Sequence, residues 1–440
     1  MKNNSENKKI NQDHQFNVNN ANNANNSNNA NRVVVTGMSI VSPIAIGVDE
    51  YFNALKNATS GITTVSNFDA SSFPISVAGE IKNKKLIQKL NEKNIDVSLM
   101  NIDRKLVFLL LAFEELLTNN QINNESKIID MIIGTGIEEF FIEDAKKIVT
   151  KEKTIEELKG RSPYIIRAIE DYPTFYLNQK IKLKGVALTN VSNCAASAQA
   201  IGIAYQRIKH GLCEQAIVGG VDSMLNPFGL LGFTRLGALS ERGRCSPFDS
   251  KRDGTVLGEG AGLLLIESYE SAIKRGAKIH SEIIAYTSSC DAYNLTHPDP
   301  SAQAVSWAIE QTLKKANLYP QDIDYINAHG TATPLNDITE TLAIKKALGD
   351  HAYKIKISAI KSMIGHLIAA AGVAGVIATI LSIKNNMAFP TINIKNVDAD
   401  CDLDYVANGT QEHKINIALC NSFGFGGFNS ILALKKFNMD

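Results

Sequence analysis

The stretch GVALTNVSNCAASAQA, residues 185–200, decides how this chain is interpreted. Its first part, residues 185–191, is an apolar run that predicts a short buried strand. Small residues follow at 193–198, and a helical pattern continues to about His210. Cys194 therefore lies where a strand turns into a helix. Because the helix dipole and the free backbone N–H groups favour an anion there, the pattern predicts a nucleophilic thiolate.

Two histidines stand in short segments that contain glycine, downstream of the cysteine. His329 lies in NAHGTATP, residues 327–334, and His366 ends KSMIGH, residues 361–366. Taken singly, each histidine could be an ordinary turn residue, and each of the six cysteines a small buried apolar residue. Taken together, one thiol and two imidazoles on turns predict covalent acyl transfer, in which the thiol carries the acyl group.

The composition limits the class of protein. The 440 residues are 44% hydrophobic and 20% charged, which is typical of a globular protein with room for two halves. The formal net charge is zero, so charge gives no support for binding nucleic acid or an anionic membrane surface. The cysteines show no CxxC or Cys/His ligand spacing, and no 18-residue apolar run is apparent. We therefore expect no disulfide scaffold, no metal site and no membrane span.

The first 31 residues differ from the rest. Ten of the fifteen residues 17–31 are asparagine, a composition that cannot bury apolar surface and predicts a disordered tail. The tail has no apolar secretory segment. It also has no arginine before Arg32, unlike a mitochondrial presequence. We expect a cytoplasmic protein.

The folded part is expected to alternate strands and helices, beginning with a strand at residues 32–37. This alternation predicts an α/β fold with largely parallel, buried sheets. A strand, a reactive turn and a helix occur in each of two halves, residues 32–280 and 281–440, with Cys194 in the first half and both histidines in the second. The other expected strands are at 131–133, 186–191, 216–220, 262–267, 324–327, 355–358 and 417–420, and the expected helices at 104–117, 200–209, 302–316 and 337–348.

Four longer motifs carry a resemblance to a known family. They are RDGTVLGEGAG (252–262), NAHGTATP (327–334), KSMIGH (361–366) and NSFGFGG (421–427). In these motifs and their order, the chain from residue 32 to residue 436 resembles the β-ketoacyl-acyl-carrier-protein synthases, and looks closest to the type II synthases of dissociated systems. The resemblance implies a thiolase-like five-layer α/β/α/β/α fold of two similar halves. It also implies a homodimer, or a heterodimer with a related synthase subunit.

By this resemblance, Cys194 is the nucleophile that holds the acyl group. His329 and His366 donate hydrogen bonds to the malonyl thioester carbonyl as it becomes an enolate, which is preorganised electrostatic stabilisation. Lys361 belongs to the same catalytic site. The backbone N–H groups of Cys194 and Phe425 form the oxyanion hole. The implied reaction is a decarboxylative Claisen condensation with malonyl-acyl-carrier protein in fatty acid or polyketide elongation.

The resemblance also implies which residues contact the substrate. Phe425 is the gate between the thiol and the acyl pocket, and Ile137 lines that pocket across the dimer interface. Thr331 and Thr333 hydrogen-bond the phosphopantetheine arm of acyl carrier protein, the expected partner, and no other cofactor is expected. The implied substrate-binding residues are Ile137, Thr331, Thr333, Phe423, Phe425 and Phe428.

Four departures from the family pattern suggest changed substrate preference rather than lost chemistry. Asn193 stands where a small residue usually precedes the nucleophile, and residues 138–139 are glutamates where glycines are usual. Gly375 replaces a buried glutamate that would support the region of Lys361. Phe428 replaces a threonine, and its bulk beside the gate is expected to narrow the range of acyl chains.

Two alternatives stay open at this stage. Gly375 and Phe428 are compatible with a non-elongating decarboxylase or acyltransferase on the same fold. The chain could also be a chain-length-factor-like partner subunit of a heterodimeric synthase, although such partners typically lack the nucleophile that Cys194 supplies. Asp337 and Glu340, three residues apart, are explained equally well as the acidic first turn of a helix.

Overall fold

The computed structural model describes residues 31–101, 103–120, 128–136, 171–181 and 183–438. Ten strands of one mixed sheet dominate them. They are β1 (Val33–Ser42), β5 (Asp130–Thr135), β6 (Ala187–Asn190), β7 (Gln215–Ser223), β8 (Glu259–Ser268), β9 (Ser281–Cys290), β10 (Tyr325–Asn327), β11 (Lys356–Ser358), β14 (Ile417–Gly424) and β15 (Phe428–Lys435). The short strand β2 (Ala45–Ile46) pairs with β1, and the pairs β3 (Ile62–Thr64) with β4 (Val77–Gly79) and β12 (Met387–Ala388) with β13 (Gln411–Glu412) form small separate sheets.

The two halves of the large sheet have the same strand order. The first half is ordered β6-β5-β7-β8-β1 and the second β11-β10-β14-β15-β9, so both read 3-2-4-5-1 when the strands are counted along the chain. The halves join where the antiparallel strands β1 and β9 pair. The predicted boundary between residues 280 and 281 falls directly before β9, and it stays a prediction.

The sheet is mixed, so the prediction of largely parallel sheets is wrong. Parallel pairing is confined to β5 with β6 and β7, and to β10 with β11 and β14. β8 and β15 run antiparallel to both of their neighbours. For β15 the reason is local, since only three residues separate it from β14, and such a short turn can join only antiparallel strands.

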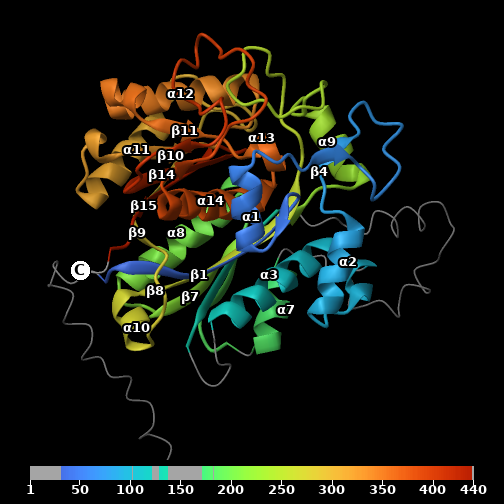
Figure 1. Ribbon diagram of the computed structural model, residues 1–440, viewed down its shortest axis with the longest axis vertical. Helices are drawn as coiled ribbons and strands as arrows, with labels where there is room; N and C mark the ends of the chain where they lie inside the picture. Colours follow the sequence, from blue (N-terminus) through green and yellow to red (C-terminus); the bar gives the residue numbers. More distant parts are fainter. Residues whose placement is uncertain (1–30, 102, 121–127, 137–170, 182, 439–440) are drawn as a thin grey trace, which may run out of the picture.

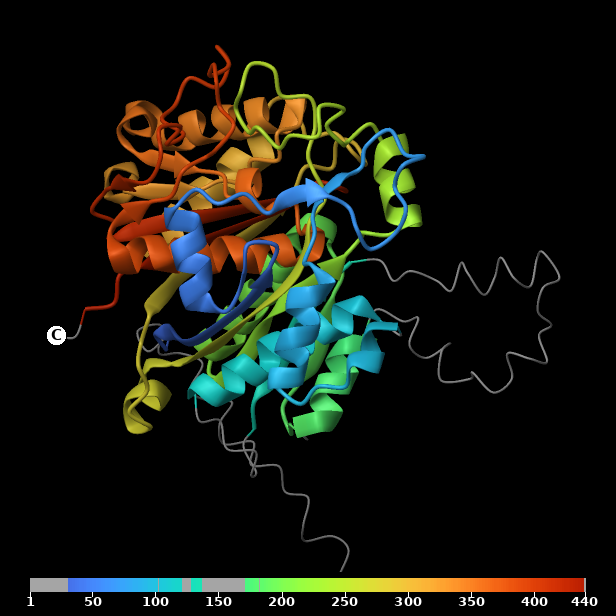
Figure 2. The ribbon, with the colours of Figure 1, turned by 45° about the vertical axis from the view of Figure 1, so that its right-hand side comes forward.

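Helices form three layers around the two half-sheets (Figure 1). α8 and α14 lie between the half-sheets, α3 and α7 cover the outer face of the first, and α11 and α12 cover the outer face of the second (Figure 2). This arrangement is the five-layer α/β/α/β/α fold that the sequence predicts. The helices are α1 (Val48–Lys56), α2 (Asn83–Glu92), α3 (Arg104–Asn120), α7 (Tyr172–Ile181), α8 (Ala196–Lys209), α9 (Pro227–Arg235), α10 (Tyr269–Lys274), α11 (Gln303–Ala316), α12 (Pro334–Leu348), α13 (Lys361–Ile364) and α14 (Ala371–Asn385).

The central helix α14 is apolar on all sides because it packs between two half-sheets. Ile368–Asn385 is long and apolar enough to cross a membrane by length and composition alone, a run that the sequence analysis does not anticipate. Within the protein, 89% of this stretch is buried, as expected for a core helix. Small residues bring α14 close to α8, since a Cβ on Gly372 would lie 2.7 Å from the backbone nitrogen of Ala198.

The strand predicted at residues 186–191 exists as β6, but it is not buried. β6 is an edge strand, and the apolar side chains of Val186, Leu188 and Val191 are 38%, 42% and 48% exposed. An apolar run is compatible with a buried strand, and equally with an edge strand whose exposed side chains can contact another protein surface. The described chain begins at Asn31, the last residue of the predicted tail, whose backbone N–H and side-chain amide donate to carbonyl oxygens at the end of α8.

Candidate active site

The predicted nucleophile lies at the bottom of a narrow cavity between the half-sheets. Cys194 is in the short 3-10 turn η4 (Asn193–Ala195), directly before α8, and is 6% exposed. The cavity has a volume of about 80 Å³. The predicted site residues that line it are Cys194, His329, Thr331, Thr333, His366, Phe423 and Phe425.

The end of β14 approaches the cysteine turn so closely that only glycine fits. A Cβ on Gly424 would lie 2.9 Å from the carbonyl oxygen of Ser192 and 3.2 Å from the backbone nitrogen of Cys194. This approach brings the backbone N–H of Phe425 to the sulfur of Cys194, where the cysteine's own N–H also points. Two backbone donors therefore converge at the thiol, which is the arrangement that stabilises a tetrahedral oxyanion.

Burial decides the protonation state of the thiol. Removal from water raises the pKa of Cys194 to about 12, and the nearby carboxylate of Asp222 also raises it. Lys361 and the two backbone N–H groups lower this pKa, but they do not overcome desolvation. The resting Cys194 is therefore a protonated thiol, in contrast to the thiolate predicted from the helix N-terminus.

The two histidines face each other across the cavity with their ring centroids 5.5 Å apart. Nδ1 of His366 accepts a hydrogen bond of 3.1 Å from the backbone N–H of Ile368, which leaves the ring proton on Nε2. Nδ1 of His329 lies 3.4 Å from the ammonium group of Lys361. Burial, followed by the charge of Lys361, holds the pKa of both imidazoles well below the ordinary value, so both rings are neutral donors.

Lys361 is the charged group behind the histidines. It begins α13, is buried, and donates a hydrogen bond of 2.5 Å from Nζ to the carbonyl oxygen of His329. Burial lowers the pKa of Lys361, and the buried carboxyl of Glu340 acts in the opposite direction. The charge of Glu340 therefore favours the protonated form of Lys361, without a direct hydrogen bond between the two groups among the described contacts.

Glu340 is the functional residue that the sequence analysis leaves undecided. Its two carboxylate oxygens accept hydrogen bonds of 2.8 Å from the backbone N–H groups of His329 and Gly330, and one of them accepts a bond of 3.0 Å from Asn421. This geometry fixes the turn that carries His329. At Gly375 there is little room for a larger residue, since a Cβ would lie 3.1 Å from the sulfur of Cys420.

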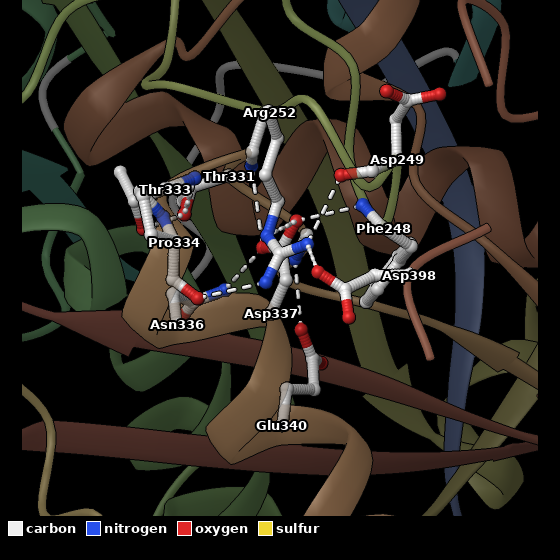
Figure 3. A network of polar contacts seen from close by, with 12 residues as sticks. Phe248, Asp249, Arg252, Thr331, Thr333, Pro334, Asn336, Asp337, Glu340 and Asp398 are labelled. Carbon is white, nitrogen blue, oxygen red and sulfur yellow. Dashed lines mark hydrogen bonds and ion pairs between the residues drawn. The ribbon is translucent and has the colours of Figure 1, made fainter. Parts of the chain in front are cut away.

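A buried arginine holds the loop that carries the two threonines (Figure 3). Arg252 donates to the carboxylate of Asp398 at 2.6 Å and to the carbonyl oxygen of Pro334 at 2.9 Å, and its Nε lies 3.7 Å from Asp337. The hydroxyl oxygens of Thr331 and Thr333 lie 2.8 Å apart on this loop. The RDG motif therefore supports the predicted phosphopantetheine-binding loop from behind.

Asp337 connects this network to the start of α12. Its carboxylate accepts hydrogen bonds from the backbone N–H groups of Phe248 at 2.8 Å and Ala332 at 3.2 Å. Asp337 is buried and lies 3.7 Å from the guanidinium of Arg252. Asp337 does lie in the acidic first turn of α12, as one of the two explanations expects, but both carboxylates are buried and accept hydrogen bonds from backbone N–H groups.

One predicted substrate-binding residue, Phe428, does not reach the cavity, and another, Ile137, is not described. Phe428 begins β15 and does not line the cavity, since its ring lies against Gly426, where a Cβ would be 2.9 Å from the ring. Ile137 lies outside the described residues, together with the two glutamates that follow it. Phe423 lines the cavity, with its ring centroid 5.4 Å from that of His329. Within the described part of the chain, no group of three His, Cys, Asp or Glu residues could hold a metal ion.

Comparison with known proteins places this chain in a class of condensing enzymes. Residues 30–272 match the family model described as Beta-ketoacyl synthase, N-terminal domain, and residues 280–395 match Beta-ketoacyl synthase, C-terminal domain. The chain belongs to the β-ketoacyl synthase family. The predicted family resemblance is confirmed.

Among individual proteins, the chain is similar to bacterial enzymes named 3-oxoacyl-[acyl-carrier-protein] synthase 2. It is 38% identical to the enzyme of Synechocystis sp. and 37% identical to that of Coxiella burnetii, in both cases over 92% of this chain and 98% of the relative. Among solved structures, the ishigamide ketosynthase/chain length factor matches with a TM-score of 0.83 and 31% identity, covering 93% of this chain and 100% of that one. A type II PKS ketosynthase in complex with its acyl-carrier protein matches with a TM-score of 0.81 and 30% identity, at the same coverage. These neighbours confirm the predicted fold.

Proposed function

We propose that this chain is a 3-oxoacyl-[acyl-carrier-protein] synthase that elongates an acyl group held on Cys194. The observation that carries the proposal is that the thiol, two backbone N–H donors and two neutral imidazoles share one narrow cavity. The names of the relatives and the carrier-protein complex of a neighbour support acyl carrier protein as the partner. We further propose that the protein acts in the cytoplasm.

The first step is thioester exchange. The sulfur of Cys194 attacks the carbonyl carbon of acyl-acyl-carrier protein, the bond between that carbon and the phosphopantetheine sulfur breaks, and the carrier leaves as a thiol. Because the pKa of Cys194 is about 12, the thiol must lose its proton as the new bond forms, and that proton ends on the leaving sulfur. The N–H groups of Cys194 and Phe425 stabilise the intermediate oxyanion.

The second step is decarboxylation and carbon–carbon bond formation. The bond to the malonyl carboxylate breaks, carbon dioxide leaves, and the electron pair forms an enolate whose oxygen accepts hydrogen bonds from His329 and His366. The enolate carbon then attacks the acyl carbonyl carbon, and the bond to Cys194 breaks as the 3-oxoacyl product forms. Cys194 leaves as a thiolate and takes up one proton from solvent, which is the proton that the overall reaction consumes. Neutral imidazoles suit this task, because each donates an N–H hydrogen bond to the enolate oxygen and keeps its proton.

The protonation state of the histidines predicts the pH dependence of decarboxylation. Since the pKa of both imidazoles lies well below about 6.5, the usual value, we expect a constant rate of malonyl-carrier decarboxylation from about pH 8 to about pH 6. The unfolded chain takes up protons on these histidines below about pH 6.5, so folding stability falls as the pH is lowered through that value. Circular dichroism at each pH must therefore accompany the rate measurement. A fall in rate centred near pH 6.5 in protein that stays folded would contradict neutral donors.

We propose that two copies of the chain pair through the edge strand β6. Its apolar side chains are exposed at Val186, Leu188 and Val191, beside the 54% exposed ring of Phe175 on α7. An apolar edge strand with free backbone groups favours continuation of the sheet into a second copy. Light scattering should give twice the chain mass, and Leu188→Lys should give monomers. A monomeric parent protein, or a dimer that Leu188→Lys leaves intact, would overturn this interface.

A product assay tests the proposed activity and separates it from the main alternative. Purified protein is supplied with acyl-acyl-carrier protein and malonyl-acyl-carrier protein, and the carrier species are measured by mass spectrometry. The proposal predicts 3-oxoacyl-acyl-carrier protein. Formation of acetyl-acyl-carrier protein alone would identify a non-elongating decarboxylase. The charge of Glu340 raises the pKa of Lys361 although position 375 is a glycine, and this supports the synthase over that alternative.

A further inference from the structure

We propose that Asn193 holds the gate of the acyl pocket closed through a hydrogen bond to Phe425, and so sets which acyl chains reach Cys194. Asn193 is a positioning residue in this proposal, because it acts through Phe425 rather than on the substrate. The inference rests on the proposed function, which requires Phe425 to move when an acyl group enters.

The backbone of Asn193 places its side chain for this contact. Asn193 has a φ of 50°, in the left-handed region that asparagine and glycine tolerate better than other residues. From this position its Nδ2 donates a hydrogen bond of 2.9 Å to the carbonyl oxygen of Phe425. The bond joins the residue directly before the nucleophile to the gate residue, 232 positions further along the chain.

The gate residue lies in a tight turn that contains two glycines. Phe425, Gly426 and Gly427 connect β14 to β15, and the two glycines have φ values of 86° and 77°. On the side away from Cys194, the turn is held by backbone hydrogen bonds from Gly426 to Leu295 and from Asp291 to Gly427. Two side chains donate hydrogen bonds to this turn: Asn193 to the carbonyl oxygen of Phe425 at 2.9 Å, and the thiol of Cys290 to that of Gly426 at 3.7 Å.

The closed position of Phe425 leaves too little space for a long acyl chain. The cavity has a volume of about 80 Å³. An engineered apolar cavity that binds benzene measures about 150 Å³, roughly twice this volume. In this proposal a long chain enters by displacing the backbone turn at Phe425. Because Asn193 binds the backbone carbonyl oxygen of Phe425, this movement breaks the hydrogen bond, whereas an acetyl group requires less movement.

The hydrogen bond should thus penalise long acyl chains more than short ones. Its loss should raise the ratio of long-chain to acetyl loading roughly fivefold, which corresponds to about 1 kcal/mol at 1.4 kcal/mol per tenfold change. A residue with only a structural role would change both loading rates together and leave their ratio constant.

Two variants separate the hydrogen bond from the backbone conformation. Asn193→Gly keeps the left-handed conformation without strain and removes the side chain, while Asn193→Asp keeps the shape but offers the carbonyl oxygen of Phe425 no N–H donor. Asn317→Gly is the matched control, because Asn317 also has a left-handed φ, of 52°, but caps α11 away from the cavity.

The experiment measures acylation of Cys194 by acetyl- and dodecanoyl-acyl-carrier protein, with peptide mapping by mass spectrometry. We expect the ratio of dodecanoyl to acetyl loading to rise roughly fivefold in Asn193→Gly and Asn193→Asp, and to stay constant in Asn317→Gly. An unchanged ratio in both Asn193 variants, with a parent protein that loads both groups, would overturn the proposal.

A second measurement keeps the inference independent of the proposed function. N-methylmaleimide and N-dodecylmaleimide alkylate Cys194 without acyl chemistry, and peptide mapping distinguishes Cys194 from the exposed Cys290. The same rise in the ratio of large to small reagent is expected in both Asn193 variants. If the parent protein loads no acyl group, the proposed function fails, and the alkylation ratio alone then decides whether Asn193 restrains the turn.

Discussion

Cys194→Ala should abolish acyl loading and condensation while the protein stays folded. The variant lacks the sulfur that forms the thioester, and no change at a distance can replace it. Because the replaced side chain is small and buried, the free energy of unfolding should fall by only about 1 kcal/mol. The measurement is intact-protein mass spectrometry after incubation with acyl-acyl-carrier protein, together with the melting temperature.

Cys213→Ala is the matched control for this variant. Cys213 is also buried, but it lies before β7 and does not line the cavity. The Cys213→Ala variant should therefore load an acyl group at the same rate as the parent protein. A stable acyl adduct on Cys194→Ala, or loss of loading in Cys213→Ala with loading kept in Cys194→Ala, would remove Cys194 from its proposed role.

His329→Ala and His366→Ala should each lower malonyl-carrier decarboxylation by about 10²–10³, since each removes one preorganised donor to the enolate oxygen. Acylation of Cys194 should persist, because its oxyanion is stabilised by backbone N–H groups that both variants retain. Acyl loading and acetyl-acyl-carrier protein formation are measured in parallel.

His210→Ala provides the comparison, because His210 is exposed at the end of α8 and is remote from the cavity lining. It should decarboxylate at the parent rate. If both His329→Ala and His366→Ala match His210→Ala in decarboxylation, the two imidazoles do not stabilise the enolate.

The catalytic groups could be predicted from sequence because each lies in a short linear motif. Cys194, His329 and His366 line one cavity, and Lys361 contacts His329; all four come from turns at the ends of strands or the starts of helices. The roles of these residues came from the family resemblance, whereas the protonation state of the thiol depends on burial. No local pattern shows that desolvation raises the pKa of Cys194 to about 12.

Residues that act through tertiary contacts were not predictable in the same way. The acidic residues at the start of α12 are consistent with a solvated first turn until the fold brings Glu340 to the backbone of His329. Likewise, the replacement of a threonine by Phe428 suggests a narrower acyl pocket. In the structure Phe428 pairs with Gly424 in the sheet, and its ring lies against Gly426 rather than in the cavity. The hydrogen bond from Asn193 to Phe425 joins residues that are 232 positions apart in the sequence, so no local pattern predicts it.

The apolar run before Cys194 shows a further limit. It predicts strand β6 correctly, but the degree of burial depends on what lies beside the strand, and no other strand of the described residues pairs with its outer edge. The same applies to the sheet, since parallel and antiparallel neighbours are set by the connections rather than by the strand residues.

A single-turnover experiment tests the central claim most directly. The protein is loaded on Cys194 with a ¹³C-labelled acyl group, freed of excess donor, and mixed with unlabelled malonyl-acyl-carrier protein. The proposed reaction predicts that the label leaves Cys194 and appears in 3-oxoacyl-acyl-carrier protein, with one carbon dioxide released per labelled product. Label that stays on Cys194 while malonyl-acyl-carrier protein is converted to acetyl-acyl-carrier protein would contradict it.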